Sequence, residues 1–201
     1  MAFERRKLTK ESIMQQKRTT PEFITELQPN EIFVFGSNLK GMHGGGAAYM
    51  DKIEKYRLLT EQIRALIEGE TDSVAVMANV CAAIHETMGF WWTGFYRVKN
   101  GELVLGPFQG PVACMHIGYG KGVCGTTWKE QQTIIVPDVE QFPGHIACSS
   151  LSRSEIVVPV FDIDGSVVAV LDIDSKDLST FDNTDRQYLE SICKMLTPLF
   201  N

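Results

Sequence analysis

The sequence predicts an α+β fold in which helices pack mainly on one face of an antiparallel sheet. Two stretches with helical spacing of apolar residues precede a run of short strands, and one more helical stretch follows it. Tight-turn dipeptides join successive strands, which is typical of antiparallel hairpins. The length of 201 residues, with 44% hydrophobic and 22% charged residues, suits one domain plus an extension.

Helices are expected on either side of the strands. A helix is expected from about Ala47, because MDKIEKYRLLTEQIRALIEG has apolar residues at helical spacing, and it should stop at Gly69. A second helix should run to Met88 from an N-cap at Asp72 or Ser73. A last helix, in FDNTDRQYLESICKMLTPLF, should be capped near residues 182–183.

About five antiparallel strands are expected between these helices. FWWTGFYRV and GELVLGPF flank an Asn-Gly pair that suits a tight hairpin. QTIIVPDV predicts a short strand that ends at Pro137. SEIVVPVFDIDGSVVAVLDIDS predicts two strands joined across an Asp-Gly turn, the clearest hairpin in the sequence.

Residues 1–46 are expected to form a poorly ordered N-terminal extension, and residues 47–201 are expected to form the folded domain. Only Glu31–Gly36 in the extension has the character of a strand, and so short a segment cannot bury a core of its own. The glycine-rich turn after that strand could present N–H groups to a phosphate, but the sequence assigns the extension no role.

Composition and charge exclude several classes of protein. A formal net charge of −6 argues against a broad nucleic-acid surface, which would need a basic excess. No apolar run approaches the roughly 18 residues of a membrane span, and the N-terminus lacks the apolar core of a secretory signal. We therefore expect a cytoplasmic protein that binds neither nucleic acid nor membrane.

The chain has five cysteines, and permanent disulfides are rare in a reducing cytoplasm. Cys81 and Cys193 lie in apolar, helical segments and are expected to be buried structural thiols. Cys114, Cys124 and Cys148 differ, because Gly, Pro, His and Ser surround them in predicted loops. These three are candidates either for a metal site or for thiol chemistry.

A zinc site would combine these three thiols with His116 and His145. Structural zinc usually shows paired short spacings such as C-x2-C, whereas here only a Cys-x-His pair and a His-x2-Cys pair come close. The pattern favours redox chemistry, and we expect no metal ion.

Three acids are expected to gather at the clearest hairpin. Asp172 and Asp174 are two residues apart, so both point to one face of their strand, and Glu155 opens the partner strand. Acids among apolar residues are costly unless they bind a cation or share a proton. A solvated strand end is the alternative interpretation.

An aromatic pair shares a face of the first strand. Trp92 and Tyr96 are four residues apart, which leaves Trp91 and Phe95 for the opposite face. An aromatic wall suits a sulfur-bound methyl group, although core packing is the commoner role of strand aromatics.

Several phrases of the sequence resemble a known family. GFYR, GPVACMHIGYGKGVCGTTW, VEQFPGHIACSSLSRSEIVVPV and AVLDIDS together resemble the free methionine-(R)-sulfoxide reductases, which are GAF domains. The resemblance runs from Lys52 to Phe200 and includes all three loop cysteines. It implies a GAF-like fold and the thiol-dependent reduction of free L-methionine-(R)-sulfoxide to methionine, without a cofactor.

The local sequence around the three thiols suggests how they would share this reaction, and the resemblance supports Cys148 as the nucleophile. Cys148, in a tight loop, would attack the sulfoxide sulfur and become a sulfenic acid. Cys114, in a glycine-rich segment, would be the main resolving thiol, and thioredoxin would reopen the disulfide. Cys124, whose pKa the start of a helix could lower, would be a secondary thiol.

The remaining candidates would bind the substrate. Glu155, Asp172 and Asp174 would bind its ammonium group or supply a proton, and Trp92 and Tyr96 would contact its S-methyl group. A non-enzymatic GAF-type sensor of a small ligand is the alternative, because GAF domains host many functions. The oligomeric state stays open, with a homodimer as one option.

Overall fold

The computed structural model describes residues 51–145 and 150–200. They belong to the second of two compact units, Met1–Met50 and Asp51–Asn201, into which the chain divides. The expectations for the extension at residues 1–46 and for Cys148 therefore lie outside the described residues.

A six-stranded antiparallel sheet forms the centre of the described unit. Its strands are β1 (Trp92–Lys99), β2 (Glu102–Gln109), β3 (His116–Gly118), β4 (Ile134–Val136), β5 (Ser154–Phe161) and β6 (Val167–Ser175). The α-helices of the described residues are α2 (Lys52–Ile67), α3 (Ser73–Met88), α4 (Gly122–Glu130) and α5 (Asn183–Leu196), and the short 3-10 helices are η1 (Val139–Gln141) and η2 (Thr197–Leu199).

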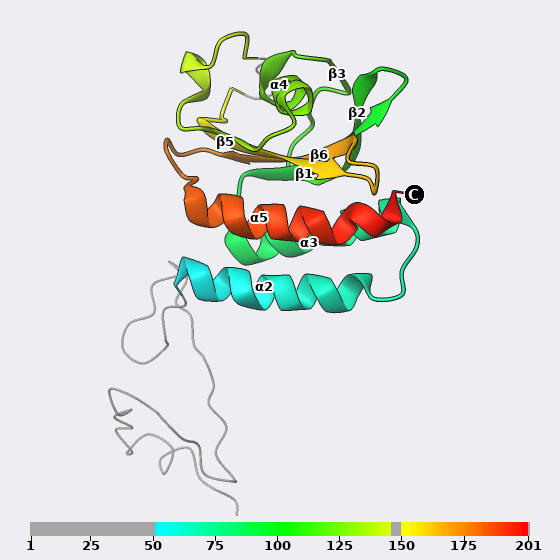
Figure 1. Ribbon diagram of the computed structural model, residues 1–201. Coiled ribbons are helices and arrows are strands. Elements are labelled where there is room, and N and C mark those ends of the chain that lie inside the picture. Colours follow the sequence, from blue (N-terminus) through cyan, green and yellow to red (C-terminus); the bar gives the residue numbers. More distant parts are fainter. Residues whose placement is uncertain (1–50, 146–149, 201) are drawn as a thin grey trace, which may run out of the picture. The chain divides into compact units, whose positions relative to one another are not determined.

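The helices lie unequally on the two faces of the sheet, whose strand order is β3-β2-β1-β6-β5-β4. α3 and α5 cover one face, α2 packs on the outside of these two helices, and α4 lies over the other face (Figure 1). This arrangement confirms the predicted α+β fold with helices mainly on one face. Within the described ranges, none of the helices has the length and apolar character needed to cross a membrane.

Side-chain caps and tight turns form where the sequence indicates. Asp72 accepts hydrogen bonds from two backbone N–H groups in the first turn of α3, at 2.8 and 2.9 Å. Asp182 forms a capping box with Asp185 at the start of α5. Gly101 and Gly165 adopt positive φ angles of 83° and 81° in the two expected hairpins.

Two elements differ from the expectation. The sheet has a sixth strand, β3, which with three residues is too short for an alternating pattern to reveal. The first helix of the unit begins at Lys52 rather than near residue 47. Asp51 caps it there by accepting a hydrogen bond from the N–H of Glu54 at 2.8 Å.

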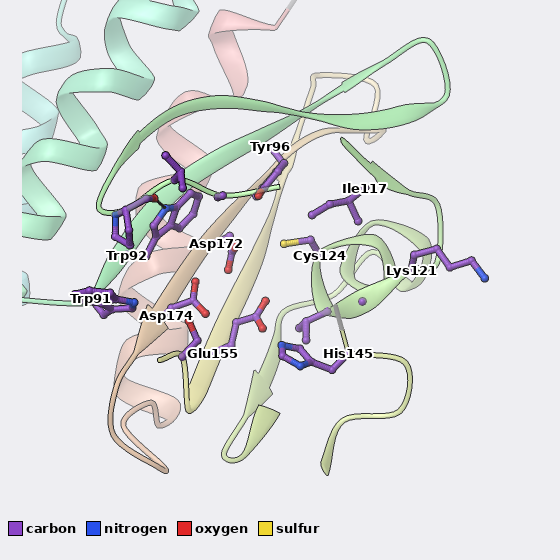
Figure 2. Close-up of a pocket in the computed structure, with 16 residues that line it drawn as sticks. Trp91, Trp92, Tyr96, Ile117, Lys121, Cys124, His145, Glu155, Asp172 and Asp174 are labelled. Atoms are coloured by element: carbon purple, nitrogen blue, oxygen red, sulfur yellow. Dashed lines mark hydrogen bonds between the residues drawn. The ribbon is translucent and has the colours of Figure 1, made fainter. Parts of the chain in front are cut away.

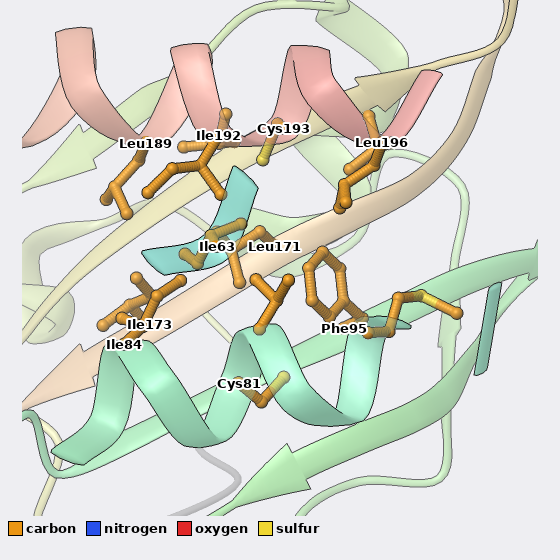
Figure 3. Packing of buried hydrophobic residues seen from close by; sticks show 14 of the residues in the cluster. Ile63, Cys81, Ile84, Phe95, Leu171, Ile173, Leu189, Ile192, Cys193 and Leu196 are labelled. Atoms are coloured by element: carbon orange, nitrogen blue, oxygen red, sulfur yellow. The ribbon is translucent and has the colours of Figure 1, made fainter. Parts of the chain in front are cut away.

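The larger hydrophobic core lies between the sheet and the three long helices (Figure 3). Leu171 and Ile173 of β6 pack there together with Leu189 of α5. Cys81 and Cys193 are buried free thiols in this core, as expected. Burial raises the pKa of both thiols well above the usual range, so neither is available as a thiolate nucleophile.

Candidate active site

A second cluster of buried side chains lies on the opposite face of the sheet and borders a cavity of about 570 Å³, mouth included (Figure 2). The cavity is lined from β1, β5 and β6 on one side and from α4 and residues 111–113 on the other. The predicted site residues that line it are Trp92, Tyr96, Cys124, Glu155, Asp172 and Asp174. Of the other two, Cys114 packs against the same cluster, and Cys148 lies outside the described residues.

Strand register brings the three carboxyl groups together. Glu155 of β5 pairs directly with Asp174 of β6, and Asp172 lies two residues along on the same face. On the other side of β6, Trp92 of β1 pairs with Asp174 and Gly94 of β1 pairs with Asp172. Glu155 is only 6% exposed and Asp172 only 7%. The predicted common face is confirmed, and a solvated strand end is excluded.

Burial is the main reason why these carboxyl groups have raised pKa values. The pKa of Glu155 lies well above its usual range because of burial and of repulsion from Asp172 and Asp174. The pKa of Asp172 is raised well above its usual range by burial and by Asp174. Burial raises the pKa of Asp174 to about 6, although a hydrogen bond with Ser152 acts in the opposite direction. The cluster therefore retains protons near neutral pH.

Cys124 enters the cavity from the first turn of α4. Its side chain is 3% exposed, and its sulfur and one oxygen each of Glu155 and Asp172 all lie within 4.8 Å of one another. Burial, followed by the charges of Asp172 and Glu155, raises the pKa of this thiol well above its usual range. The expectation that the helix start lowers this pKa is therefore wrong. Burial and two acids outweigh the helix dipole.

The aromatic pair forms one wall of the cavity. The ring centroids of Trp92 and Tyr96 are 6.0 Å apart. The Trp92 indole N–H donates to the carbonyl of Pro111, and the Tyr96 hydroxyl donates to the carbonyl of Cys114, both at 3.0 Å. These two bonds tie the segment that carries Cys114 to the aromatic wall. Phe95 lies in the core on the helix side, as expected.

Trp91 also lines the cavity, so the expectation that it lies on the opposite face is wrong. It precedes the first residue of β1, and strand alternation therefore does not govern its side chain. The Lys176 ammonium lies 3.4 Å from the centroid of the Trp91 ring, a cation–π contact that holds the indole in place. Ser152 also lines the cavity, but no local sequence pattern indicates this. For Trp91, the adjacent Trp92 of the same Trp-Trp pair could have indicated a place at the cavity.

The cysteines of the described residues fall into two states. Cys114 is disulfide-bonded, whereas Cys81, Cys124 and Cys193 are free. A disulfide beside the aromatic wall is compatible with thiol redox chemistry in this cavity.

Within the described residues, neither histidine considered for the zinc site belongs to a group of side chains that could hold a metal ion. His116 lies exposed on β3, and its Nδ1 pairs with Glu102 at 3.0 Å. His145 lines the cavity, and burial lowers its pKa, which favours the neutral imidazole.

Residues 70–196 match the family model of the GAF domain. The chain therefore belongs to the GAF domain family, whose fold is the one predicted from the sequence.

Its relatives define a narrower group within that family. GAF domain-containing protein A of Dictyostelium discoideum is 54% identical over 146 residues, which are 72% of this chain and 92% of the relative. Free methionine-R-sulfoxide reductase of Saccharomyces cerevisiae is 38% identical over 172 residues, covering 80% of this chain and 96% of the relative. The X-ray structure of free methionine-R-sulfoxide reductase from Neisseria meningitidis in complex with its substrate has a TM-score of 0.74 and 49% identity, covering 79% of this chain and 96% of that one. These similarities confirm the resemblance to free methionine-(R)-sulfoxide reductases.

Proposed function

We propose that this protein reduces free L-methionine-(R)-sulfoxide to methionine. Two of the relatives described above carry the name of this reaction. The observation that carries the proposal is the composition of one cavity, in which buried carboxyl groups face an aromatic wall tied to a disulfide-bonded cysteine. The carboxyl groups suit the substrate ammonium, the aromatic wall suits its S-methyl group, and the cysteine suits reduction of its sulfoxide.

The carboxyl cluster supports binding of a free amino acid. Buried carboxylates without a positive partner are costly, and the substrate ammonium would supply that partner. In peptide-bound methionine sulfoxide a neutral amide replaces the ammonium, so the cavity should prefer the free amino acid. Trp92 and Tyr96 would contact the S-methyl group, because sulfur and its methyl group pack well against aromatic rings.

In the proposed reaction the Cys148 thiolate attacks the sulfoxide sulfur. The oxygen passes to Cys148 as a sulfenic acid, and methionine leaves with its sulfur reduced by two electrons. The acid cluster would supply the proton that the oxygen takes up, which the raised pKa values of Glu155 and Asp172 support. The Cys114 thiol then condenses with the sulfenic acid to give a disulfide and water. A thioredoxin dithiol finally reduces this disulfide.

The states of the other thiols support the division of roles between them. Cys114 is already disulfide-bonded, which supports its role as the main resolving thiol. Cys124 is buried and stays protonated, so we assign it a secondary role. Thioredoxin as the reductant and a cytoplasmic location are further parts of the proposal.

Incubation of the protein with each methionine sulfoxide and a dithiol tests the proposed function. We expect methionine from the free R-sulfoxide, none from the S-sulfoxide, and little from N-acetylmethionine-(R)-sulfoxide, which lacks the ammonium. The non-enzymatic sensor alternative predicts saturable binding of the free sulfoxide without any methionine. That outcome would show that the reductase function is wrong.

Gly94 makes room for the aromatic wall. A Cβ at this position would lie 2.2 Å from a ring carbon of Trp92 and 2.6 Å from the Cβ of Phe108. Gly94→Ala should displace the indole and raise KM for the free sulfoxide by about 10-fold or more, with a smaller change in kcat. Gly118→Ala is the matched control, because its Cβ would meet only the flexible Lys121 side chain at 3.3 Å. If steady-state kinetics give the same KM for Gly94→Ala as for the wild type, the position of the Trp92 indole does not affect substrate binding.

Removal of residues 1–46 should leave turnover unchanged. A protein that begins at Ala47 keeps the Asp51 cap of α2 and also Lys52, whose ammonium pairs with a buried aspartate of α5. A protein that begins at Lys55 loses both contacts and should unfold at a lower temperature. Thermal unfolding and kcat/KM measure the two effects. Loss of activity at an unchanged unfolding temperature would show that residues 1–46 complete the site.

A further inference from the structure

Three buried groups of different chemistry converge in the cavity from three separate elements. Cys124 comes from α4, Glu155 from β5 and Asp172 from β6. Figure 2 shows the Cys124 sulfur directed toward the two carboxyl groups. Sulfur and carboxylate oxygens are all within 4.8 Å of one another, and each side chain is at least nine-tenths buried.

One of these groups lacks the partner that its burial demands. Among the described residues, Oδ1 of Asp172 is buried without a hydrogen-bond donor. An oxygen in that position is costly unless a ligand satisfies it or the carboxyl groups share a proton. A substrate ammonium group could donate a hydrogen bond to this oxygen. It would not explain why the Cys124 thiol lies on the same side of the cavity.

We propose that Cys124, Glu155 and Asp172 bind a thiophilic divalent cation of the Zn²⁺ class, and that this cation competes with the amino-acid substrate. The competition rests on the proposed function, whereas the binding does not. This set differs from the zinc set considered from the sequence, because it contains no histidine and only one of the three loop cysteines.

The geometry and the types of ligand suit such a cation. Tetrahedral zinc takes thiolate sulfur at about 2.3 Å and carboxylate oxygen at about 2.0–2.2 Å, so these ligand atoms lie roughly 3.3–3.7 Å apart. The three ligand atoms already lie within 4.8 Å of one another, so metal binding would need only small side-chain rotations. On binding, the Cys124 S–H bond breaks, the proton leaves to solvent and a metal–sulfur bond forms, without any change of oxidation state. Mg²⁺ and Ca²⁺ prefer oxygen ligands only, so the thiol selects against them.

The experiment uses the full-length protein in its oxidised form, because the disulfide at Cys114 then removes that thiol as a competing ligand. Cd²⁺, a thiophilic probe with a thiolate-to-metal charge-transfer absorption, is titrated into the protein, and Zn²⁺ is followed with a chromophoric chelator. We expect one equivalent to bind with this absorption and Mg²⁺ not to compete. Free methionine, which carries the same ammonium as the substrate, should weaken the apparent affinity.

Two substitutions localise the metal. Cys124→Ser should remove the charge-transfer absorption and weaken binding by roughly 100-fold. Cys193→Ser, at a buried free thiol of the other core, is the matched control and should leave both unchanged. Glu155→Gln should weaken binding while the absorption persists at saturation, which keeps the test valid where the serine variant folds poorly.

Two outcomes would overturn the inference. Binding in the wild type that lacks the thiolate absorption, or an absorption unchanged in Cys124→Ser, would show that Cys124 holds no metal. The metal-binding experiment tests this inference independently of the proposed function, because it needs no turnover. A protein that binds Cd²⁺ through Cys124 yet never forms methionine contradicts only the reductase proposal. A reductase that shows no absorption dependent on Cys124 contradicts only the metal site.

Discussion

Replacement of Cys148 by serine should abolish methionine formation, even in a single turnover. A serine hydroxyl is not ionised near neutral pH, so no nucleophile remains to attack the sulfoxide sulfur. Cys114→Ser should behave differently, since it removes only the resolving thiol. It should form one methionine per protein and stop as a sulfenic acid. Rapid quenching of pre-reduced protein without an external reductant measures the methionine. Trapping with a 1,3-dione, followed by mass spectrometry, locates the sulfenic acid.

Controls for this experiment come from the other cysteines. Cys193→Ser, in the core between helices and sheet, should keep full thioredoxin-linked turnover. One equivalent of methionine from Cys148→Ser would show that the nucleophile is elsewhere. Normal turnover in Cys114→Ser together with a Cys124–Cys148 bridge in the wild type would reverse the roles of the two partner thiols.

Asp172→Asn should lower kcat/KM for the free sulfoxide by about 100-fold or more. The amide keeps the shape of the side chain but removes a carboxyl group that holds a proton at a raised pKa and attracts the substrate ammonium once it is ionised. Steady-state kinetics with the free R-sulfoxide measure the effect. Near-native kinetics would show that this buried acid takes no part in the reaction.

The same substitution should stabilise the protein in the absence of substrate. Because the pKa values of Asp172 and Asp174 are higher in the folded state, that state binds more protons than the unfolded state above about pH 4. The free energy of unfolding therefore falls as pH rises from about 4 through the Asp174 pKa of about 6, and Asp172 extends the fall to higher pH. Removing Asp172 removes its share of this loss and some of the repulsion in the cluster.

Urea unfolding at about pH 5 and about pH 7.5 measures this gain, which should be larger at the higher pH. Asp164→Asn, at an exposed turn position, is the matched control and should show no gain that depends on pH. Lower stability of Asp172→Asn at both pH values would mean that the carboxylate is already stabilised in the cavity without a ligand.

The sequence alone determined most of the helices and strands and the strand faces on which most of the site residues lie. Helical spacing, the caps at Asp72 and Asp182, and the Asn-Gly and Asp-Gly turns are local signals, because they depend on residues a few positions apart. Strand alternation likewise placed Asp172 and Asp174 on one face, since a strand has a period of two. The sequence motifs that contain the three loop cysteines carried the resemblance to the reductase family.

Only the tertiary structure decided the burial of those side chains, their neighbours and their pKa values. Trp91 borders the cavity because β1 begins one residue later, and β3 was too short to leave a pattern. Cys124 follows the start of a helix, which locally favours a thiolate, yet burial beside Glu155 and Asp172 raises its pKa instead. Desolvation and repulsion depend on groups from α4, β5 and β6 that are distant in the sequence. Local patterns carry no information about such distances, so these properties follow only from the packed fold.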